Sequence, residues 1–217
     1  GRVSVDFLIA EGSVVQSGTV LVSATGPTRD LLTAERTALN LLGHLSGVAS
    51  ITRQWVDAIA GTGAAIRDTR KTTPGLRELE KFAVRCGGGR NHRMSLSDAA
   101  LVKDNHVVAA GGVRQAFEAV RQQWPDLAIE VEVDSLEQLA EVLDAGADLV
   151  LLDNMDPAMT KQAVALTAGR ATLESSGGLT LDRARAYAET GVDYLSVGAL
   201  THSAPVLDIR SEEHTSE

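Results

Sequence analysis

The chain has 217 residues, of which 44% are hydrophobic and 23% charged, a composition that supports one or two globular domains with a sizeable core. Its net charge of -9 and aromatic content of 3% count against a nucleic-acid surface, because such surfaces are basic and stack bases on aromatic rings. No apolar run approaches a membrane span, no signal peptide opens the sequence, and a single cysteine, Cys86, suits a reducing compartment. We therefore expect a cytoplasmic protein that binds neither nucleic acid nor membranes.

Both ends of the sequence are unusual. The chain starts without methionine in a stretch that already reads as a strand, and its last eight residues, RSEEHTSE, match the translation of a common sequencing adapter. We expect a fragment whose front is missing and whose residues 210–217 are a non-native, disordered tail.

The first 62 residues predict the truncated part of an α/β sandwich. Residues 3–32 read as short strands punctuated by glycines, and residues 33–60 have helical periodicity. Thr33 is a plausible N-cap, and Gly47 is expected to separate two helices.

From residue 63 to residue 209 the pattern alternates between strands and helices, which predicts parallel strands with helices outside. Six strands are expected, at Ala64–Asp68, Ala99–Lys103, Ile129–Val133, Leu149–Leu152, Ala171–Leu173 and Tyr194–Val197. Five helices are expected between them, at Leu76–Arg85, Val113–Gln122, Leu136–Ala145, Pro157–Ala168 and Leu181–Glu189.

Polar residues follow most of these strands. Functional side chains at the carboxyl ends of five or six successive parallel strands face one another only across a barrel mouth, whereas an open sheet concentrates its ligand at one switch point. We therefore predict an incomplete TIM-like α/β barrel of about six parallel strands.

One group of polar residues is cationic. Between residues 68 and 106 there are eight Lys or Arg against five Asp or Glu, a local charge of +3 in an acidic chain. The candidate anion ligands are Arg70, Lys71, His92, Arg93 and Lys103. The glycines before Arg90 are expected to bend over the pocket. The alternative is an ordinary solvated surface.

A second group is acidic. Glu132 and Asp153 end neighbouring predicted strands, and their oxygen atoms suit a hard divalent ion such as Mg²⁺ shared with a substrate phosphate. Charge balance by ion pairing is the alternative interpretation.

A third group would bind phosphate. The segment ESSGGLT places small residues between a strand and a helix, and SVGALTHS supplies a second glycine-bearing turn after the next strand. No nucleophile with a partner base stands out, since Cys86 and His44 both suit structural roles. Catalysis by positioning and electrostatics is therefore expected.

The motifs together resemble those of a known family. TAERTALNLLGHLSGVAS, DTRKTTPGLRELEKFAV, GGGRNHRMSLSDAALVKDNH, IEVEVDSLEQLAEVLDAGADLVLLDNM and LESSGGL are similar to the quinolinate phosphoribosyltransferases, over about residues 1–209. The resemblance implies transfer of phosphoribose from phosphoribosyl pyrophosphate to quinolinate with loss of CO₂, which yields nicotinate mononucleotide and pyrophosphate for NAD biosynthesis.

The resemblance also implies roles for single residues. Arg70, His92, Arg93 and Lys103 would hold the quinolinate carboxylates, and Arg36 would reach that site from a partner subunit of a homodimer or a higher homo-oligomer. Lys71 would meet the pyrophosphate, and Glu132 and Asp153 the ribose hydroxyls and Mg²⁺. The 5′-phosphate would bind Ser176, Gly177, Gly178 and Gly198. Lys71, Lys103, Glu132 and Asp153 are the candidate catalytic residues.

Three other interpretations stay open at this point. They are a related phosphoribosyltransferase-like protein linked to molybdenum transport, a non-catalytic subunit, and an inactive fragment of the enzyme. The intact set of candidate ligands favours the enzyme over the first two.

Overall fold

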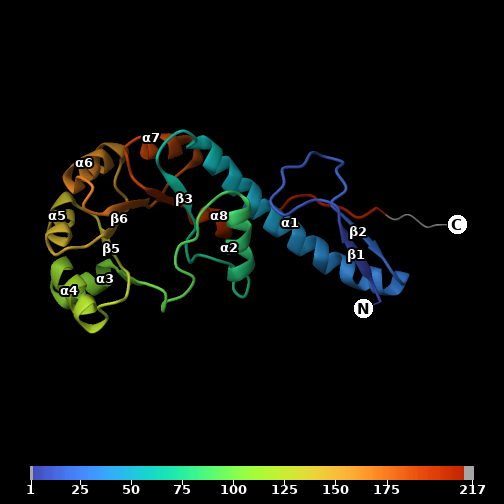
Figure 1. The fold of residues 1–217 in the computed structure, drawn as a ribbon, viewed down its shortest axis with the longest axis horizontal. Helices are drawn as coiled ribbons and strands as arrows, with labels where there is room; N and C mark the ends of the chain where they lie inside the picture. The colour runs from blue at the N-terminus through green and yellow to red at the C-terminus, as the bar shows by residue number, and fades with distance from the viewer. Residues whose placement is uncertain (1, 213–217) are drawn as a thin grey trace.

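The computed structural model describes residues 2–212, which form a small sheet at one end and a large parallel sheet at the other (Figure 1). The small sheet pairs β1 (Ser4–Phe7) with β2 (Val22–Thr25) in antiparallel orientation. The long helix α1 (Thr28–Ala58) begins beside this sheet and runs to the parallel sheet (Figure 1). Three of the five buried residues of α1 are small or polar. Within residues 2–212, no helix combines the length and the apolar character of a membrane span.

The strand and helix alternation that the sequence predicted is confirmed after residue 63. The six parallel strands are β3 (Ala65–Arg67), β4 (Ala100–Val102), β5 (Ile129–Val133), β6 (Leu149–Asp153), β7 (Thr172–Ser176) and β8 (Tyr194–Ser196). The elements between and after them are α2 (Arg77–Cys86), α3 (Asp104–Ala110), α4 (Val113–Gln123), α5 (Leu136–Asp144), α6 (Pro157–Thr167), η1 (Leu181–Arg183), α7 (Ala184–Ala188) and α8 (Ala199–His202).

The parallel sheet is an incomplete barrel. Its strand order is β3-β8-β7-β6-β5-β4, a circular order in which β3 and β4, the first two strands of this sheet, lie at its two edges. Helices α4 to α7 line the outside of the curve (Figure 1). Among residues 2–212 no ladder joins β3 to β4, and only an isolated bridge between Arg67 and Arg90 extends the β3 edge. The predicted fold class is therefore confirmed.

The two faces of this sheet differ in polarity. The outer face carries residues such as Ile66, Val150 and Leu195, which pack against the helices in two apolar clusters. The inner face alternates with it: Glu132 and Glu174 both lie opposite Leu151, and Glu174 also lies opposite Tyr194. Charged residues in the strands therefore point into the barrel and not toward solvent.

The predicted break at Gly47 is wrong, because α1 continues through it. Gly47 is buried where the chain segment after α8 crosses the helix, and an added Cβ would lie 1.8 Å from the Pro205 carbonyl oxygen. The glycine permits this close approach. The helix also begins at Thr28 after Pro27, so Thr33 is not its N-cap and instead donates its hydroxyl hydrogen to the Arg29 carbonyl, at 2.6 Å.

Other departures from the sequence prediction are short elements. Helices α3 and α8 were not predicted, and the last predicted helix is split into η1 and α7. In the segment expected to be a tail, residues 210–212 are described and Ser211 donates to Glu35, at 2.6 Å. Residues 213–217 lie outside the described part of the chain.

We predict that Gly47→Ala destabilises the protein by roughly 1–3 kcal/mol, as overpacking does in other cores. The direction is informative, because alanine has the higher helix propensity and would otherwise stabilise α1. Urea unfolding measures the change. Gly63→Ala is the control, since a Cβ there meets nothing within 4 Å. A Gly47→Ala protein as stable as Gly63→Ala would show that the crossing segment is not held against α1.

Candidate active site

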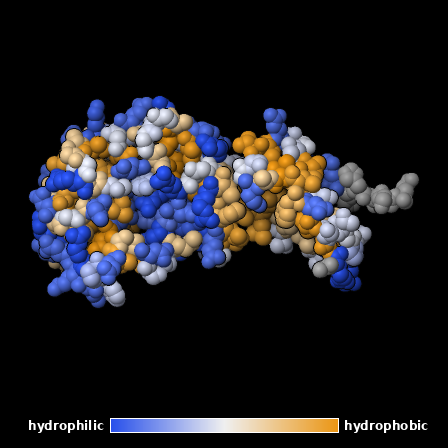
Figure 2. Space-filling view, viewed as in Figure 1, coloured by the Kyte–Doolittle hydropathy of each residue, from blue (hydrophilic) through white to orange (hydrophobic). Residues whose placement is uncertain are grey.

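Most of the candidate residues lie at or just beyond the carboxyl ends of the parallel strands, which meet at one edge of the sheet. Arg70 and Lys71 follow β3, Lys103 follows β4, and Gly198 follows β8. Glu132 lies near the end of β5, and Asp153 and Ser176 end β6 and β7. Hydrophilic residues gather over the centre of this half of the molecule, and hydrophobic residues over the half that carries β1 and β2 (Figure 2).

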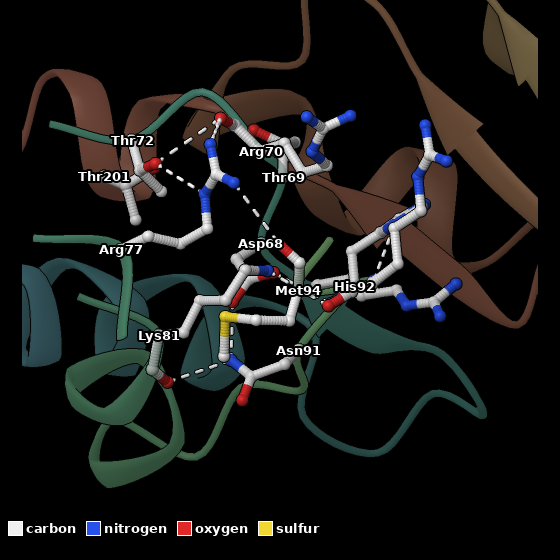
Figure 3. Close-up of polar contacts among 12 residues, drawn as sticks. Asp68, Thr69, Arg70, Thr72, Arg77, Lys81, Asn91, His92, Met94 and Thr201 are labelled. Atoms are coloured by element: carbon white, nitrogen blue, oxygen red, sulfur yellow. Dashed lines mark hydrogen bonds and ion pairs between the residues drawn. The ribbon is translucent and has the colours of Figure 1, made fainter. Parts of the chain in front are cut away.

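A fully buried ion pair fixes the entrance to the site. Asp68, just after β3, contacts Lys81 of α2, and both side chains are completely buried. The pair also holds the backbone of His92 on both sides (Figure 3): the His92 N–H donates to Asp68 at 2.8 Å, and Lys81 donates to the His92 carbonyl at 3.0 Å. Burial lowers the pKa of Lys81, while the hydrogen bond to Asp68 opposes that shift. Two segments far apart in sequence are thereby fixed together.

Arg77 and Glu80 shape the loop that carries Arg70. Arg77 donates to the Thr72 hydroxyl at 3.0 Å and to the Arg70 carbonyl at 3.4 Å (Figure 3). The buried Glu80 accepts from the Thr73 N–H at 3.0 Å and contacts His44 of α1 at 2.8 Å. His44 thus has the structural role expected of it.

The glycines before Arg90 do not form a flexible flap, so that expectation is corrected. Gly87 is buried, and an added Cβ would lie 2.4 Å from the Ala49 carbonyl oxygen of α1. At Gly89 an added Cβ would lie 2.8 Å from both Thr52 and Val84. The small residues let this loop pack closely against α1 and α2, which holds the following residues in place.

Arg70 and Arg93 are near enough for their charges to interact. Both are half-buried, and the Nε atom of each is buried without a hydrogen-bond partner in the described structure. Burial lowers the pKa of Arg93, and the nearby charge of Arg70 lowers it further. Arg93 also donates to the Ala99 carbonyl at 2.7 Å. Two adjacent guanidinium groups with free donors suit a planar ligand that carries two carboxylates.

His92 does not lie with these arginines as expected. Its ring points to the barrel interior, where Nε2 is 2.7 Å from Glu130 and Nδ1 accepts from the Arg93 N–H at 2.8 Å. Both ring nitrogens are therefore already in use by the protein.

Lys103 and the two acidic residues lie together and more exposed. Lys103 donates to Glu132 at 2.8 Å, with 47% of the lysine side chain exposed. Asp153 accepts from the Asn154 side chain at 2.6 Å. The register places Glu132 and Asp153 on the same face of neighbouring strands, since Glu132 lies opposite Leu151. Two accessible carboxylates on one face are a donor set that fits a hard divalent cation.

The two glycine turns each lie against another site residue. Gly177 has φ of +94°, and an added Cβ would lie 2.2 Å from the Asn154 side-chain oxygen. At Gly198 an added Cβ would lie 3.2 Å from the Lys71 side chain. Thr201 donates to the Lys71 carbonyl at 2.7 Å. Lys71 is thus brought beside the turn after β8, where a phosphate-bearing substrate is expected.

Several residues of this region were not predicted as site residues. They are Arg67, Glu130, Asn154, Glu174 and Thr201, and no short sequence pattern marks them as site residues. Arg36 is not brought to the site within the chain: it is exposed in the first half of α1, which runs beside β1 and β2 (Figure 1).

Comparison with known proteins agrees with this geometry. The family model "Quinolinate phosphoribosyl transferase, N-terminal domain" matches residues 1–46, and the model "Quinolinate phosphoribosyl transferase, C-terminal domain" matches residues 48–212. The boundary between the two models falls within α1.

Named relatives and solved structures show the same likeness. A nicotinate-nucleotide pyrophosphorylase [carboxylating] of Mycobacterium leprae is 56% identical over 94% of this chain and 72% of its own length. A probable enzyme of that name from Bacillus subtilis is 45% identical over 92% of this chain and 69% of its own. The crystal structure of NadC from Streptococcus pyogenes superposes with a TM-score of 0.91 at 44% identity, over 95% of this chain and 74% of that one. The chain belongs to the quinolinate phosphoribosyl transferase family.

Proposed function

We propose that the carboxyl ends of the six parallel strands are where this chain joins phosphoribose to quinolinate, with Arg70 and Arg93 binding the quinolinate carboxylates. The reaction is that of the family: phosphoribosyl pyrophosphate and quinolinate give nicotinate mononucleotide, pyrophosphate and CO₂. The chain is a phosphoribosyltransferase of NAD biosynthesis. The observation that carries the site assignment is the pair of half-buried arginines whose Nε donors have no partner.

The residues support a reaction driven by position and charge. The quinolinate nitrogen attacks the anomeric carbon of the ribose while the bond to pyrophosphate breaks, so negative charge grows on the leaving group. Lys71, held beside Gly198, is placed to stabilise that charge. The 2-carboxylate then leaves as CO₂, the positively charged ring nitrogen next to it stabilises the electron pair that remains on carbon, and that carbon takes up a proton from water. This step needs little acid–base help from the protein.

Glu132 and Asp153 are the residues that would hold Mg²⁺ and the ribose hydroxyls. Bound there, the ion would neutralise charge on the departing pyrophosphate. Lys103 is paired with Glu132 through an exposed contact, which contributes little to stability. The Lys103 ammonium is therefore free to turn toward an anion. Ser176, Gly177, Gly178 and Gly198 are proposed to bind the 5′-phosphate through their backbone N–H groups.

A second copy of the chain is proposed to complete the site with Arg36. Large exposed apolar side chains gather on the half that carries β1 and β2 (Figure 2), and they include Phe7 at 75% and Val14 at 86% exposure. Exposed apolar surface of this kind marks an interface. An interface there would cover the part of α1 that carries Arg36. The cytoplasm remains the expected location, on the ground of the single cysteine.

We expect Arg93→Ala to weaken quinolinate binding far more than phosphoribosyl pyrophosphate binding. Removing one partner of a desolvated charge contact costs roughly 2–5 kcal/mol, so the quinolinate KM should rise at least about 30-fold. Steady-state kinetics with each substrate varied in turn measures the split. Arg114→Ala is the control. Arg114 lies on outer helix α4, and its one ion pair within the described residues is with Glu118. Equal effects on both substrates would refute the assignment of Arg93.

Activity should depend on Mg²⁺. Excess chelator is expected to abolish product formation and added Mg²⁺ to restore it, because the two carboxylates alone do not neutralise a departing pyrophosphate. Asp153→Asn should lower turnover more than it lowers quinolinate affinity. Asp144→Asn, which alters an exposed ion pair with Arg170, serves as the control. Full activity in chelator would exclude the metal role.

Mixing two inactive variants tests whether Arg36 acts across a dimer. Arg36→Ala and Lys103→Ala subunits should each be nearly inactive alone. After mixing and subunit exchange, half of the dimers are hybrids and one of their two sites is intact, so about a quarter of wild-type activity should return. No recovery, with exchange verified by mass spectrometry of the hybrid, would mean that Arg36 does not act on the partner's site.

A further inference from the structure

The barrel interior below the proposed site holds a buried cluster of ionisable side chains that the reaction does not use directly. Its members are Arg67 of β3, His92, Glu130 of β5 and Glu174 of β7, and they come from segments far apart in sequence. Glu130 and Glu174 are at most 2% exposed as side chains. Arg67 is 2.5 Å from Glu174 and 4.0 Å from Glu130.

The hydrogen bonds of His92 define its protonation. A backbone N–H always donates, so Nδ1, which accepts from the Arg93 N–H, carries no hydrogen. The hydrogen must then be on Nε2, which lies 2.7 Å from Glu130. The ring is therefore neutral, and each of its nitrogens has a protein partner. With its backbone held by Asp68 and Lys81, His92 has no polar group left for a ligand.

The charges of the cluster balance if Glu174 carries a proton. Arg67 supplies one positive charge and the neutral imidazole supplies none, so two ionised carboxylates would leave one buried negative charge uncompensated. Burial raises the pKa of Glu174, and the neighbouring Glu130 raises it further. One oxygen on each carboxylate also lacks a partner in the described structure, which a proton on Glu174 would help to satisfy.

A metal ion fits this cluster less well than a proton does. The ligand atoms of His92, Glu130 and Glu174 lie within 4.8 Å of one another, which is close enough for a metal. However, Nε2 faces Glu130 with its hydrogen and cannot bind a metal in that form, and Arg67 already provides a cation beside both carboxylates.

We propose that His92 is a positioning residue and not a ligand of quinolinate, and that Glu130 and Glu174 act through it to set the direction of Arg93. Glu130 orients the His92 ring, the ring nitrogen accepts the Arg93 N–H, and this fixes the backbone from which the Arg93 side chain reaches the anion site. Arg67 and Glu174 hold Glu130 from the other side. The inference rests on the proposed function only in taking Arg93 as a quinolinate ligand.

Nitrogen NMR of the free protein, labelled with ¹⁵N-histidine, tests the tautomer without any activity. The His92 resonances, assigned by their loss in His92→Gln, should show a hydrogen on Nε2 and none on Nδ1. Saturating quinolinate should leave them so. A hydrogen on Nδ1, in the free protein or after addition of quinolinate, would overturn the proposal, because a protonated Nδ1 cannot accept from the Arg93 N–H.

Kinetics of two Glu130 variants tests the coupling to Arg93. Glu130→Ala should raise the quinolinate KM about 10- to 100-fold and change the phosphoribosyl pyrophosphate KM little. A loss of this size is typical when a group that orients a binding residue through a hydrogen bond is removed. Glu130→Gln should recover most of that loss, since its amide oxygen still accepts from Nε2. A Gln variant as impaired as the Ala variant, or equal effects on both substrates, would contradict the proposal.

Two further measurements separate the remaining outcomes. If Glu130→Ala does not fold, the NMR test on the wild-type protein still decides the role of His92. Stoichiometric Zn²⁺ or Mn²⁺ in the purified protein, lost in Glu174→Gln, would overturn the proposal in favour of a metal centre. If the wild-type protein is inactive on quinolinate, the proposed function is refuted. The tautomer of His92 is decided separately, by the NMR spectrum.

Discussion

The buried ion pair between Asp68 and Lys81 is the constraint on which the rest of the site depends. Two opposite charges removed from water are stable together only if their remaining hydrogen-bonding capacity is met. Here the backbone of His92 and the side chain of Asn91 meet it. The pair therefore does not simply add stability. It requires the loop after α2 to lie against the end of β3, and so brings Arg93 beside Arg70.

Two environments of different charge follow from this arrangement. Inside the barrel, Arg67 and the Glu130–Glu174 pair are nearly balanced around a neutral His92. At the carboxyl ends of the strands, the Nε donors of Arg70 and Arg93 have no hydrogen-bond partner among residues 2–212, and Lys103 is half-exposed in its pair with Glu132. An excess of positive charge at the mouth attracts anionic substrates, although the whole chain carries -9. A balanced interior avoids competing with the substrate for the arginines.

Much of the fold could be predicted because strand and helix periods are local. The strand IEVEV was placed correctly over Ile129–Val133, yet its alternation alone would put its glutamates in solvent. Only the closure of the sheet turns that face into an interior, so Glu130 and Glu174 could not be recognised as buried. Gly47 misled for the same reason: its contact is with Pro205, more than 150 residues away in the chain. That the candidate residues at strand ends lie at one edge of the sheet could be predicted, because parallel strands present those ends together. The direction of the His92 ring depends on contacts that no short pattern encodes.

As proposed, His92 serves a reaction that needs little acid–base help by positioning a ligand. Transfer by positioning requires that charged ligands be held to within fractions of an ångström, and an arginine side chain has many rotamers to restrict. The hydrogen bond from the Arg93 guanidinium to the Ala99 carbonyl restricts them in part. A neutral imidazole fixes the backbone from which that side chain starts, because it accepts one hydrogen bond and donates another along a fixed plane without adding charge. A lysine or arginine in its place would bring an additional positive charge, and an aliphatic residue would leave Glu130 and the Arg93 N–H unpaired. The residue type at position 92 therefore follows from the Glu130 carboxylate and the Arg93 N–H that its ring connects.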